Sequence, residues 1–250
     1  MTTRSRRRRS QRRQSRRGGR WRIVLAILLL FIGGGLLALN PIKKVLIEQG
    51  TEVSRVANLT PEKIKENKKK EVTYNFDDIE QLDASTVVRD KLLGNAEASD
   101  LPTVGAIAMP ELGMNLPIHM GVSNTGMYLG AGTLDPDQEM GKSNYPLASH
   151  HSIDHDLLFA PLMRAEYGQK IYLTDLEKVY EYTVDYIEQV PAEAVYLLDP
   201  TEKPVVTLIT CDYGLVDRIV VRGTMSDEMP LNKASKDILD AFDITQTIAE

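Results

Sequence analysis

Cysteine is nearly absent from this chain, since Cys211 is the only one among 250 residues. A single thiol cannot form an intramolecular disulfide, so a disulfide-stabilised framework is excluded. Aromatic residues make up only 6% of the chain, and neither an internal repeat nor a second long apolar run is visible. Hydrophobic residues at 42% and charged residues at 26% are ordinary for a globular protein. The length allows one sizeable domain with appendages.

Acidic residues are missing from the first 22 positions, which hold 11 arginines. With 11 of the 30 basic residues placed there, the other 228 residues carry 19 basic and 35 acidic side chains. The formal net charge of -5 therefore conceals two segments of opposite sign.

Charged residues of either sign are absent from residues 23–39, a run of 17 that is near the lower limit for crossing a bilayer core of about 30 Å. Trp21 stands at its edge, as interfacial aromatic residues do. Arginines before the run and acids after it predict a signal anchor. Residues 1–22 would then be a cytoplasmic tail, with everything from Asn40 onward outside the cell membrane.

Two alternatives to this single-pass topology are a cleaved secretory signal and a nucleic-acid-binding arm. The apolar run is longer than a usual signal, and residues 36–40 contain no convincing small-x-small cleavage site. The apolar run follows the arginines directly, so membrane orientation accounts for the arginine cluster and no nucleic-acid binding is needed to explain it. We expect them to contact anionic membrane lipids instead.

Residues 40–100 are predominantly polar and predict a stalk with N-terminal helices. Thr60 and Pro61 are typical of a helix start, as N-cap and first helical residue, and the lysine-rich sequence after them predicts a solvated helix. A second helix is expected over residues 85–93, ending before Gly94 and Asn95.

Short apolar or alternating stretches between turn residues begin after Leu101 and predict a mainly β domain over residues 101–228. A helical extension is expected over residues 229–250, because apolar side chains recur there with helical spacing. The predicted strands are residues 104–109, 114–119, 145–149, 169–174, 178–189, 204–210 and 218–224.

The chemistry of the chain centres on Cys211 and four histidines, of which His150, His151 and His155 are clustered. A thiol nucleophile needs a nearby imidazole or cation to form the thiolate, and it needs a general acid for the leaving group. The cluster can supply the imidazole, and Arg218 can supply a permanent cation. The alternative for Cys211 is a buried structural cysteine.

A metal site is the alternative for His151 and His155, which are four residues apart, beside Asp154 and Asp156. That spacing places two imidazoles on one face only in a helix, whereas this segment is typical of a strand end and a polar loop. We therefore expect solvated loop histidines and no metal. His119, at the end of a predicted strand, is expected at the surface.

Three separated segments resemble the sortases, which are membrane-anchored cysteine transpeptidases of Gram-positive bacteria. They are Thr207–Cys211 (TLITC), Arg218 after it, and Ala148-Ser149-His150. Residues 115–118 and 130–133 are also similar to class A members, so the resemblance covers roughly residues 102–224. The N-terminal anchor and the lack of a C-terminal hydrophobic tail favour class A over the pilus-polymerising class C.

The resemblance implies a closed eight-stranded β-barrel with short helices, and it implies roles for three residues. Cys211 is expected as nucleophile. His150 is expected as the acid and base, in preference to His151, because the family's histidine follows the Ala-(Gly/Ser) pair directly. Arg218 is expected to hold the substrate carbonyl. Arg222 competes with it, because both have the same parity along a strand.

The implied reaction is cleavage of an LPxTG-like sorting signal between Thr and Gly through a thioacyl-enzyme. The surface protein is then transferred to an amine of a lipid-linked peptidoglycan precursor. The resemblance also implies that Ala148, Thr210, Leu197 and Leu198 bind substrate, the leucines in a loop that pockets the signal's apolar first residue. Simple core packing is the alternative for that loop. No cofactor is expected, and Glu111 and Glu193 do not make a convincing calcium site.

Two other functions remain open on the sequence. One is a membrane-anchored cysteine peptidase, because water can also resolve a thioester. The other is a non-enzymatic anchored binding module in which Cys211 is merely buried.

Overall fold

The computed structural model describes residues 17–75, 79, 84–93, 98–152, 154–212, 214 and 216–244. Contacts within the chain divide it between Asn40 and Pro41 into two compact units. The helix α1 (Arg17–Val53) crosses this boundary.

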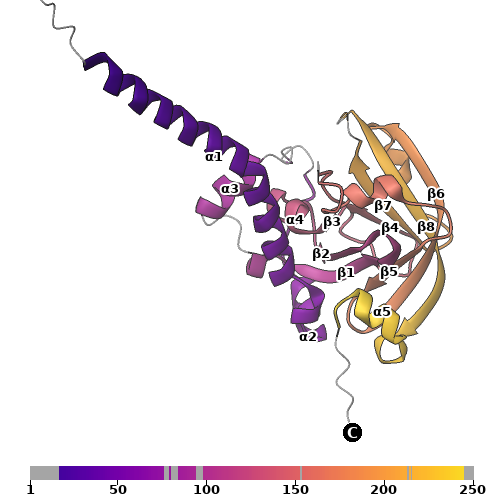
Figure 1. Ribbon diagram of the computed structural model, residues 1–250. Coiled ribbons are helices and arrows are strands. Elements are labelled where there is room, and N and C mark those ends of the chain that lie inside the picture. Colours follow the sequence, from indigo (N-terminus) through magenta and orange to yellow (C-terminus); the bar gives the residue numbers. More distant parts are fainter. Residues whose placement is uncertain are drawn as a thin grey trace, which may run out of the picture. The chain divides into compact units, whose positions relative to one another are not determined.

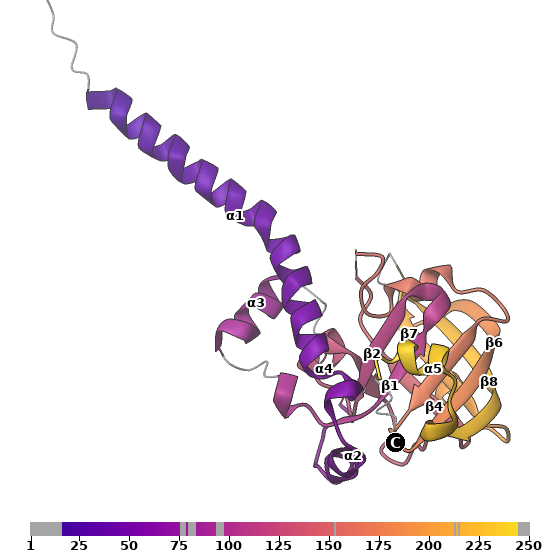
Figure 2. The ribbon, with the colours of Figure 1, turned by 60° about the horizontal axis from the view of Figure 1, so that its bottom comes forward.

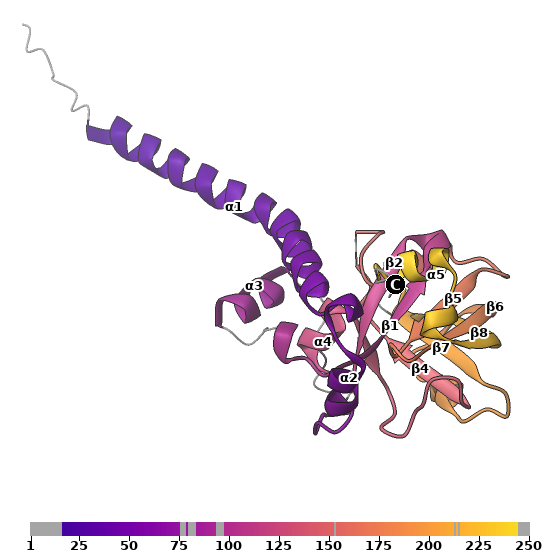
Figure 3. The ribbon, with the colours of Figure 1, turned by 90° about the horizontal axis from the view of Figure 1, so that it is seen from below.

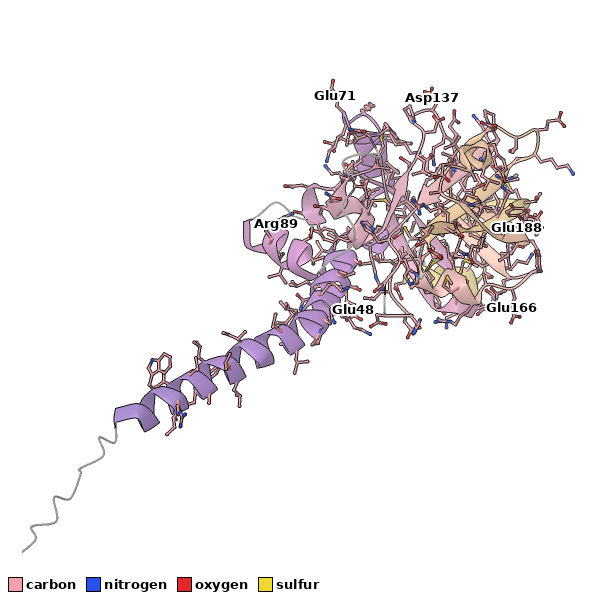
Figure 4. All side chains as sticks on the ribbon, turned by 90° about the horizontal axis from the view of Figure 1, so that it is seen from above. Glu48, Glu71, Arg89, Asp137, Glu166 and Glu188 are labelled. Atoms are coloured by element: carbon pink, nitrogen blue, oxygen red, sulfur yellow. The ribbon has the colours of Figure 1, made fainter. Side chains whose placement is uncertain are left out.

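Residues 23–39 of α1 are apolar and most of them are exposed; Leu30 and Phe31 are each 73% exposed. Among the described residues, Trp21–Val53 is the one helix that is long and apolar enough to cross a membrane, with a mean hydropathy of 2.6. It includes the predicted span, residues 23–39. Figure 4 shows the side chains of this part projecting outward along the helix.

Eight strands close into a barrel in the order β1-β2-β3-β4-β7-β8-β6-β5 (Figures 1 and 2). The pairs β2–β3 and β4–β7 are parallel, and the other pairs are antiparallel. The strands are β1 (Thr103–Met109), β2 (Met114–His119), β3 (Ala131–Thr133), β4 (Asn144–Ala148), β5 (Lys170–Thr174), β6 (Lys178–Pro191), β7 (Val205–Cys211) and β8 (Asp217–Pro230).

The closed eight-stranded barrel implied by the resemblance is confirmed. Seven of its strands match the predicted ranges closely, although β8 runs six residues further than residue 224. The strand β3 was missed because it has only three residues and contains a glycine. Gly132 is required there, because a Cβ atom would lie 2.7 Å from the carbonyl oxygen of Gly121.

The barrel interior is filled by large apolar side chains, including the fully buried Ile107, Leu147 and Tyr182. A second core lies on the outer face of β1, where Ala106 and Ala108 are completely buried. Because β1 places small alanines on this face, helices can pack closely against it. This second core includes residues of α5 (Lys236–Ala241), which lies across one end of the barrel in Figure 3.

The segment expected as a stalk packs on the barrel over part of its length. Ile47 of α1 is 1% exposed, and the Thr51 hydroxyl donates a 2.9 Å hydrogen bond to the Leu129 carbonyl. The helix α2 (Pro61–Asn67) begins where predicted, and the Thr60 side chain accepts a hydrogen bond from the Lys63 N–H.

The expectation that α2 is solvated is wrong for one of its faces. Ile64 is 1% exposed, and the Asn67 side chain donates a 2.8 Å hydrogen bond to the Thr103 carbonyl at the start of β1. One isoleucine among many lysines is a weak sequence signal, so only the docked structure identifies the buried face.

The remaining helices are short. They are α3 (Ala84–Leu93), α4 (Asn124–Leu129) and the 3-10 turns η1 (Val56–Asn58), η3 (Ala98–Asp100), η4 (Pro110–Leu112), η5 (Ala160–Arg164), η6 (Val195–Leu198) and η7 (Leu231–Lys233). The predicted cap of α3 at Gly94 and Asn95 lies outside the described residues. The predicted C-terminal helix is present as α5, with Ser235 as its N-cap.

Candidate functional site

The site lies where the neighbouring strands β4, β7 and β8 meet. The strands β4 and β7 are parallel, with Ala148 paired with Ile209, so His150 and Cys211 follow at the same edge of the sheet. The strands β7 and β8 are antiparallel, and Cys211 pairs directly with Arg218. Cys211 is a half-buried free thiol. The barrel thus brings His150 beside Cys211 and Arg218, which follow it by about 60 residues in sequence.

A pocket of about 500 Å³ opens at this point. All seven residues predicted for the site line it, namely Ala148, His150, Leu197, Leu198, Thr210, Cys211 and Arg218. Its walls are mainly apolar, and the sequence prediction missed Val190, Ile209 and Val220 among them. Their alternation along β6, β7 and β8 predicts burial, but it does not indicate which buried residues face a pocket.

Ser149 anchors the segment that carries His150. Its side chain is buried, and its hydroxyl lies 2.7 Å from the carbonyl oxygen of Gly130 and 3.3 Å from that of Met127. Met127 lies in α4, and Gly130 connects α4 to β3. The backbone beyond β4 is therefore held against this connection, which orients His150 toward the pocket that it lines.

Burial lowers the pKa of His150 from 6.5 to about 4. The imidazole is thus neutral at neutral pH. A neutral imidazole can accept a proton before it donates one, which is the sequence of events required of a single residue that acts as base and then as acid.

The register of β7 and β8 separates the two candidate arginines. Arg218 lies opposite Cys211, whereas Arg222 lies opposite Thr207, four residues away along β7. The Arg222 guanidinium donates to the Thr207 hydroxyl at 3.0 Å and to the Leu197 carbonyl at 2.7 Å. The Nη1 atom of Arg218 donates only to the adjacent Asp217 carbonyl, at 3.1 Å, within the described part of the chain.

The connection between Cys211 and Arg218 is closed by Asp212, which the sequence prediction did not single out. Its Oδ1 atom accepts hydrogen bonds from the backbone N–H groups of Val216 and Asp217, at 2.9 and 3.2 Å. Its own N–H donates to the Asp217 carbonyl at 3.1 Å. A short aspartate-capped loop thus holds the ends of β7 and β8 together.

Thr210 is 2% exposed, and its hydroxyl oxygen has no hydrogen-bond partner among the residues that the structure describes. An unpaired buried hydroxyl costs free energy. Thr210 has the same parity along β7 as the core residue Leu208, so its hydroxyl faces the barrel interior.

The expectation that His119 lies at the surface is wrong. It ends β2 as predicted but is 1% exposed, and its Nδ1 atom lies 3.1 Å from the Thr103 hydroxyl. Burial lowers the pKa of this imidazole to about 3. The residue is buried because α4 covers this end of β2, with Gly126 close to the His119 side chain.

His151 and His155 lie in a non-helical segment, as expected, so their spacing does not place them on one helix face. Within the described ranges, no group of three or more His, Cys, Asp or Glu residues is arranged to hold a metal ion.

Comparison with known proteins gives a consistent result. The model of the Sortase domain matches residues 107–226. The chain is 35% identical over 230 residues to Sortase A of Streptococcus agalactiae serotype III (strain NEM316), covering 89% of this chain and 91% of that protein. It is 36% identical over 188 residues to Sortase A of Listeria monocytogenes, covering 75% of this chain and 83% of the relative.

A solved structure supports the same relationship. The crystal structure of Listeria monocytogenes sortase A superimposes with a TM-score of 0.53 at 38% sequence identity. The match covers 58% of this chain and 99% of that one.

Proposed function

Because this chain belongs to the sortase family, as a class A member, we propose that Cys211, His150 and Arg218 carry out its transpeptidation reaction. The protein is an enzyme, a cysteine transpeptidase that acts on sorting signals. One observation carries the residue assignment. The free thiol of Cys211, the imidazole of His150 and the guanidinium of Arg218 line one pocket, at the ends of neighbouring strands.

The proposed first half-reaction acts on an LPxTG-like signal. The sulfur of Cys211 bonds to the carbonyl carbon of the Thr–Gly peptide, and the thiol proton passes to His150. The tetrahedral intermediate then collapses as the carbon–nitrogen bond breaks. The imidazolium of His150 gives its proton to the departing Gly amine, and a thioester remains on Cys211.

The lowered pKa of His150 supports this proton path. A neutral imidazole has no proton to give, so in this path the thiol supplies the proton for the leaving amine. In the second half-reaction an acceptor amine attacks the thioester and loses its proton to His150. The thiol of Cys211 is then restored.

Arg218 is proposed to donate to the substrate carbonyl oxygen as negative charge develops on it. Its place opposite Cys211 and its single hydrogen bond to an adjacent carbonyl support this role. Thr210 is proposed to bind the same substrate through its backbone, because the residue lines the pocket while its hydroxyl is buried. Ala148, Leu197 and Leu198 are proposed to form the apolar surface for the first residue of the signal.

The enzyme is a membrane-anchored protein whose substrates are surface proteins and cell-wall precursors. We further propose that residues 1–22 are cytoplasmic, that 23–39 span the membrane, and that the catalytic barrel of residues 101–228 lies outside the cell. Residues 40–100 would connect the two, and 229–250 would form a C-terminal helical extension. The excess of arginine before the span supports this orientation. The proposed acceptor is an amine of lipid-linked peptidoglycan.

The test uses the full chain in detergent micelles with an LPxTG peptide and intact-mass spectrometry. A thioester adduct on Cys211 is expected, and Cys211→Ala should form none. His150→Ala should abolish turnover while the matched neighbour His151→Ala preserves it. Arg218→Ala should slow acylation by about 100-fold, as the loss of one oxyanion donor does, whereas Arg222→Ala should still acylate at saturating peptide. The reverse result for the two arginines would refute the assignment.

Product analysis with and without an added amine separates transfer from hydrolysis. A ligated product that depends on oligoglycine or another amine is expected. If hydrolysis is the outcome with every amine tested, the alternative function, a cysteine peptidase, would be favoured. If no adduct forms and Cys211→Ala changes only stability, the chain is a binding module.

A further inference from the structure

A closed ring of hydrogen bonds includes the carbonyl of Leu197, a residue of the pocket wall. The Nε atom of Arg222 donates to the Thr207 hydroxyl at 3.0 Å, and that hydroxyl donates to Asn144 Oδ1 at 2.7 Å. The Nδ2 atom of Asn144 donates to the Leu197 carbonyl at 2.8 Å. Arg222 Nη2 donates to the same carbonyl at 2.7 Å and so completes the ring. The Leu197 oxygen thus accepts two hydrogen bonds, one for each lone pair.

The three side chains of this ring come from three different strands. Asn144 begins β4, Thr207 lies in the middle of β7, and Arg222 lies opposite Thr207 on β8. Thr207 is completely buried and Asn144 is 6% exposed. Each member of the ring makes hydrogen bonds to two other members. The ring is therefore a satisfied polar network, and such a network is rigid.

The ring holds the turn η6 (Val195–Leu198), which supplies Leu197 and Leu198 to the pocket wall. Asn144 also donates to the Asp199 carbonyl at 3.1 Å, so the residue after the turn is fixed as well. Leu197 is otherwise held by packing with Val190 and Val220. The turn has just four residues, so its position depends on these few attachments.

Arg222 engages main-chain and neutral groups instead of an acid. Its guanidinium carbon lies 5.8 Å from the centre of the Tyr186 ring, and Tyr186 packs against the cluster that contains Leu197. Within the described residues, no carboxylate lies within ion-pair distance of Arg222. The planar guanidinium has several N–H donors, so it can donate to one carbonyl and one hydroxyl at once. A lysine ammonium cannot do so in the same geometry.

We propose that Asn144, Thr207 and Arg222 are positioning residues that hold η6 in place and so set the selectivity for an apolar side chain at the first position of the sorting signal. The proposal rests on the proposed function, because it concerns the peptide that the pocket takes. These residues act through the Leu197 carbonyl and touch neither the scissile bond nor Cys211.

The test compares two peptides on the full chain in detergent, one with leucine and one with alanine at the first signal position. In Thr207→Val and in Arg222→Ala we expect KM for the leucine peptide to rise about tenfold, the effect of losing one or two buried hydrogen bonds. The kcat value should stay close to that of the unchanged protein. Selectivity for leucine over alanine should fall by the same factor as KM rises.

Two further variants distinguish positioning from general stability. Arg222→Lys should recover part of the selectivity, because an ammonium can reach one of the two acceptors. The double variant Thr207→Val with Arg222→Ala should lose little more than either single variant, since both act through one ring. Arg164→Ala is the matched control, because this arginine also donates to a main-chain carbonyl, that of His155, and does not line the pocket.

The outcomes separate the two proposals. If the unchanged protein forms no thioester, the proposed function fails. If it does form one, and the ring variants lower thermal stability with an unchanged leucine-to-alanine ratio, the ring is only structural and this inference is refuted. A fall in kcat with constant KM would refute it equally.

Discussion

At the scale of single residues, the buried His119 makes stability depend on pH. Its pKa is about 3 in the folded chain and 6.5 in the unfolded one, so below pH 6.5 the unfolded state binds a proton that the folded state does not. The stabilisation is complete above pH 6.5 and is lost as the pH falls toward 3. Between pH 6.5 and 5 the loss should be about 2 kcal/mol, at about 1.4 kcal/mol per pH unit.

Urea unfolding of the full chain in detergent at these two pH values measures the total decline, to which His150 also contributes because its pKa is lowered to about 4. In His119→Gln the decline should be smaller by the same 2 kcal/mol or so, because the titrating group is gone. The exposed His155→Gln serves as control and should keep the full decline. An equal decline in all three proteins would contradict the burial of His119.

Individual residues also show what sequence reasoning reaches at the site. The types and order of His150, Cys211 and Arg218 predict thiol chemistry, because a thiol, an imidazole and a cation are rarely combined without such a use. Parity could not separate Arg218 from Arg222, since both point to the same side of β8. The register decides it, by pairing Arg218 with Cys211 and Arg222 with Thr207.

At the scale of elements, the short strand β3 is the one that sequence patterns cannot reveal. Its backbone passes so close to Gly121 that no side chain fits at position 132. Gly132→Ala should therefore destabilise the fold by about 1 to 3 kcal/mol, as overpacking does. The change is measured as the free energy of unfolding in urea.

Gly33→Ala is the control for that substitution, because no atom lies within 4 Å of a Cβ added there and alanine favours helices. Its free energy of unfolding should not fall. If Gly132→Ala were equally harmless, the close contact between residue 132 and Gly121 would not exist in solution.

At the scale of the whole molecule, the two compact units predict where the chain can be cut. A chain that starts at Pro41 lacks the apolar part of α1 and should move from the membrane fraction to the soluble fraction. It should still form the thioester at the rate of the full chain, because the barrel and its second core are intact. Fractionation and intact-mass spectrometry measure both outcomes.

A chain that starts at Pro61 should behave differently. It loses Ile47 and Val56, each 1% exposed, whose burial contributes about 2 kcal/mol apiece. We expect a clearly lower thermal midpoint than in the chain that starts at Pro41. Equal midpoints would mean that residues 41–60 are a free stalk, as their polar composition predicts.

The sequence by itself determined the chemistry and the class of fold. Strand alternation, the apolar run and the residues of the TLITC segment are local features, readable within a few neighbours. Only the tertiary structure decided which side chains are shielded from water and which ones meet. The burial of His119 and Ile64 and the ring around the Leu197 carbonyl join segments that are distant in sequence. The pairing of Arg218 with Cys211 is closer in sequence, but it depends on the register between β7 and β8. Packing and strand register create these contacts, and no local pattern encodes them.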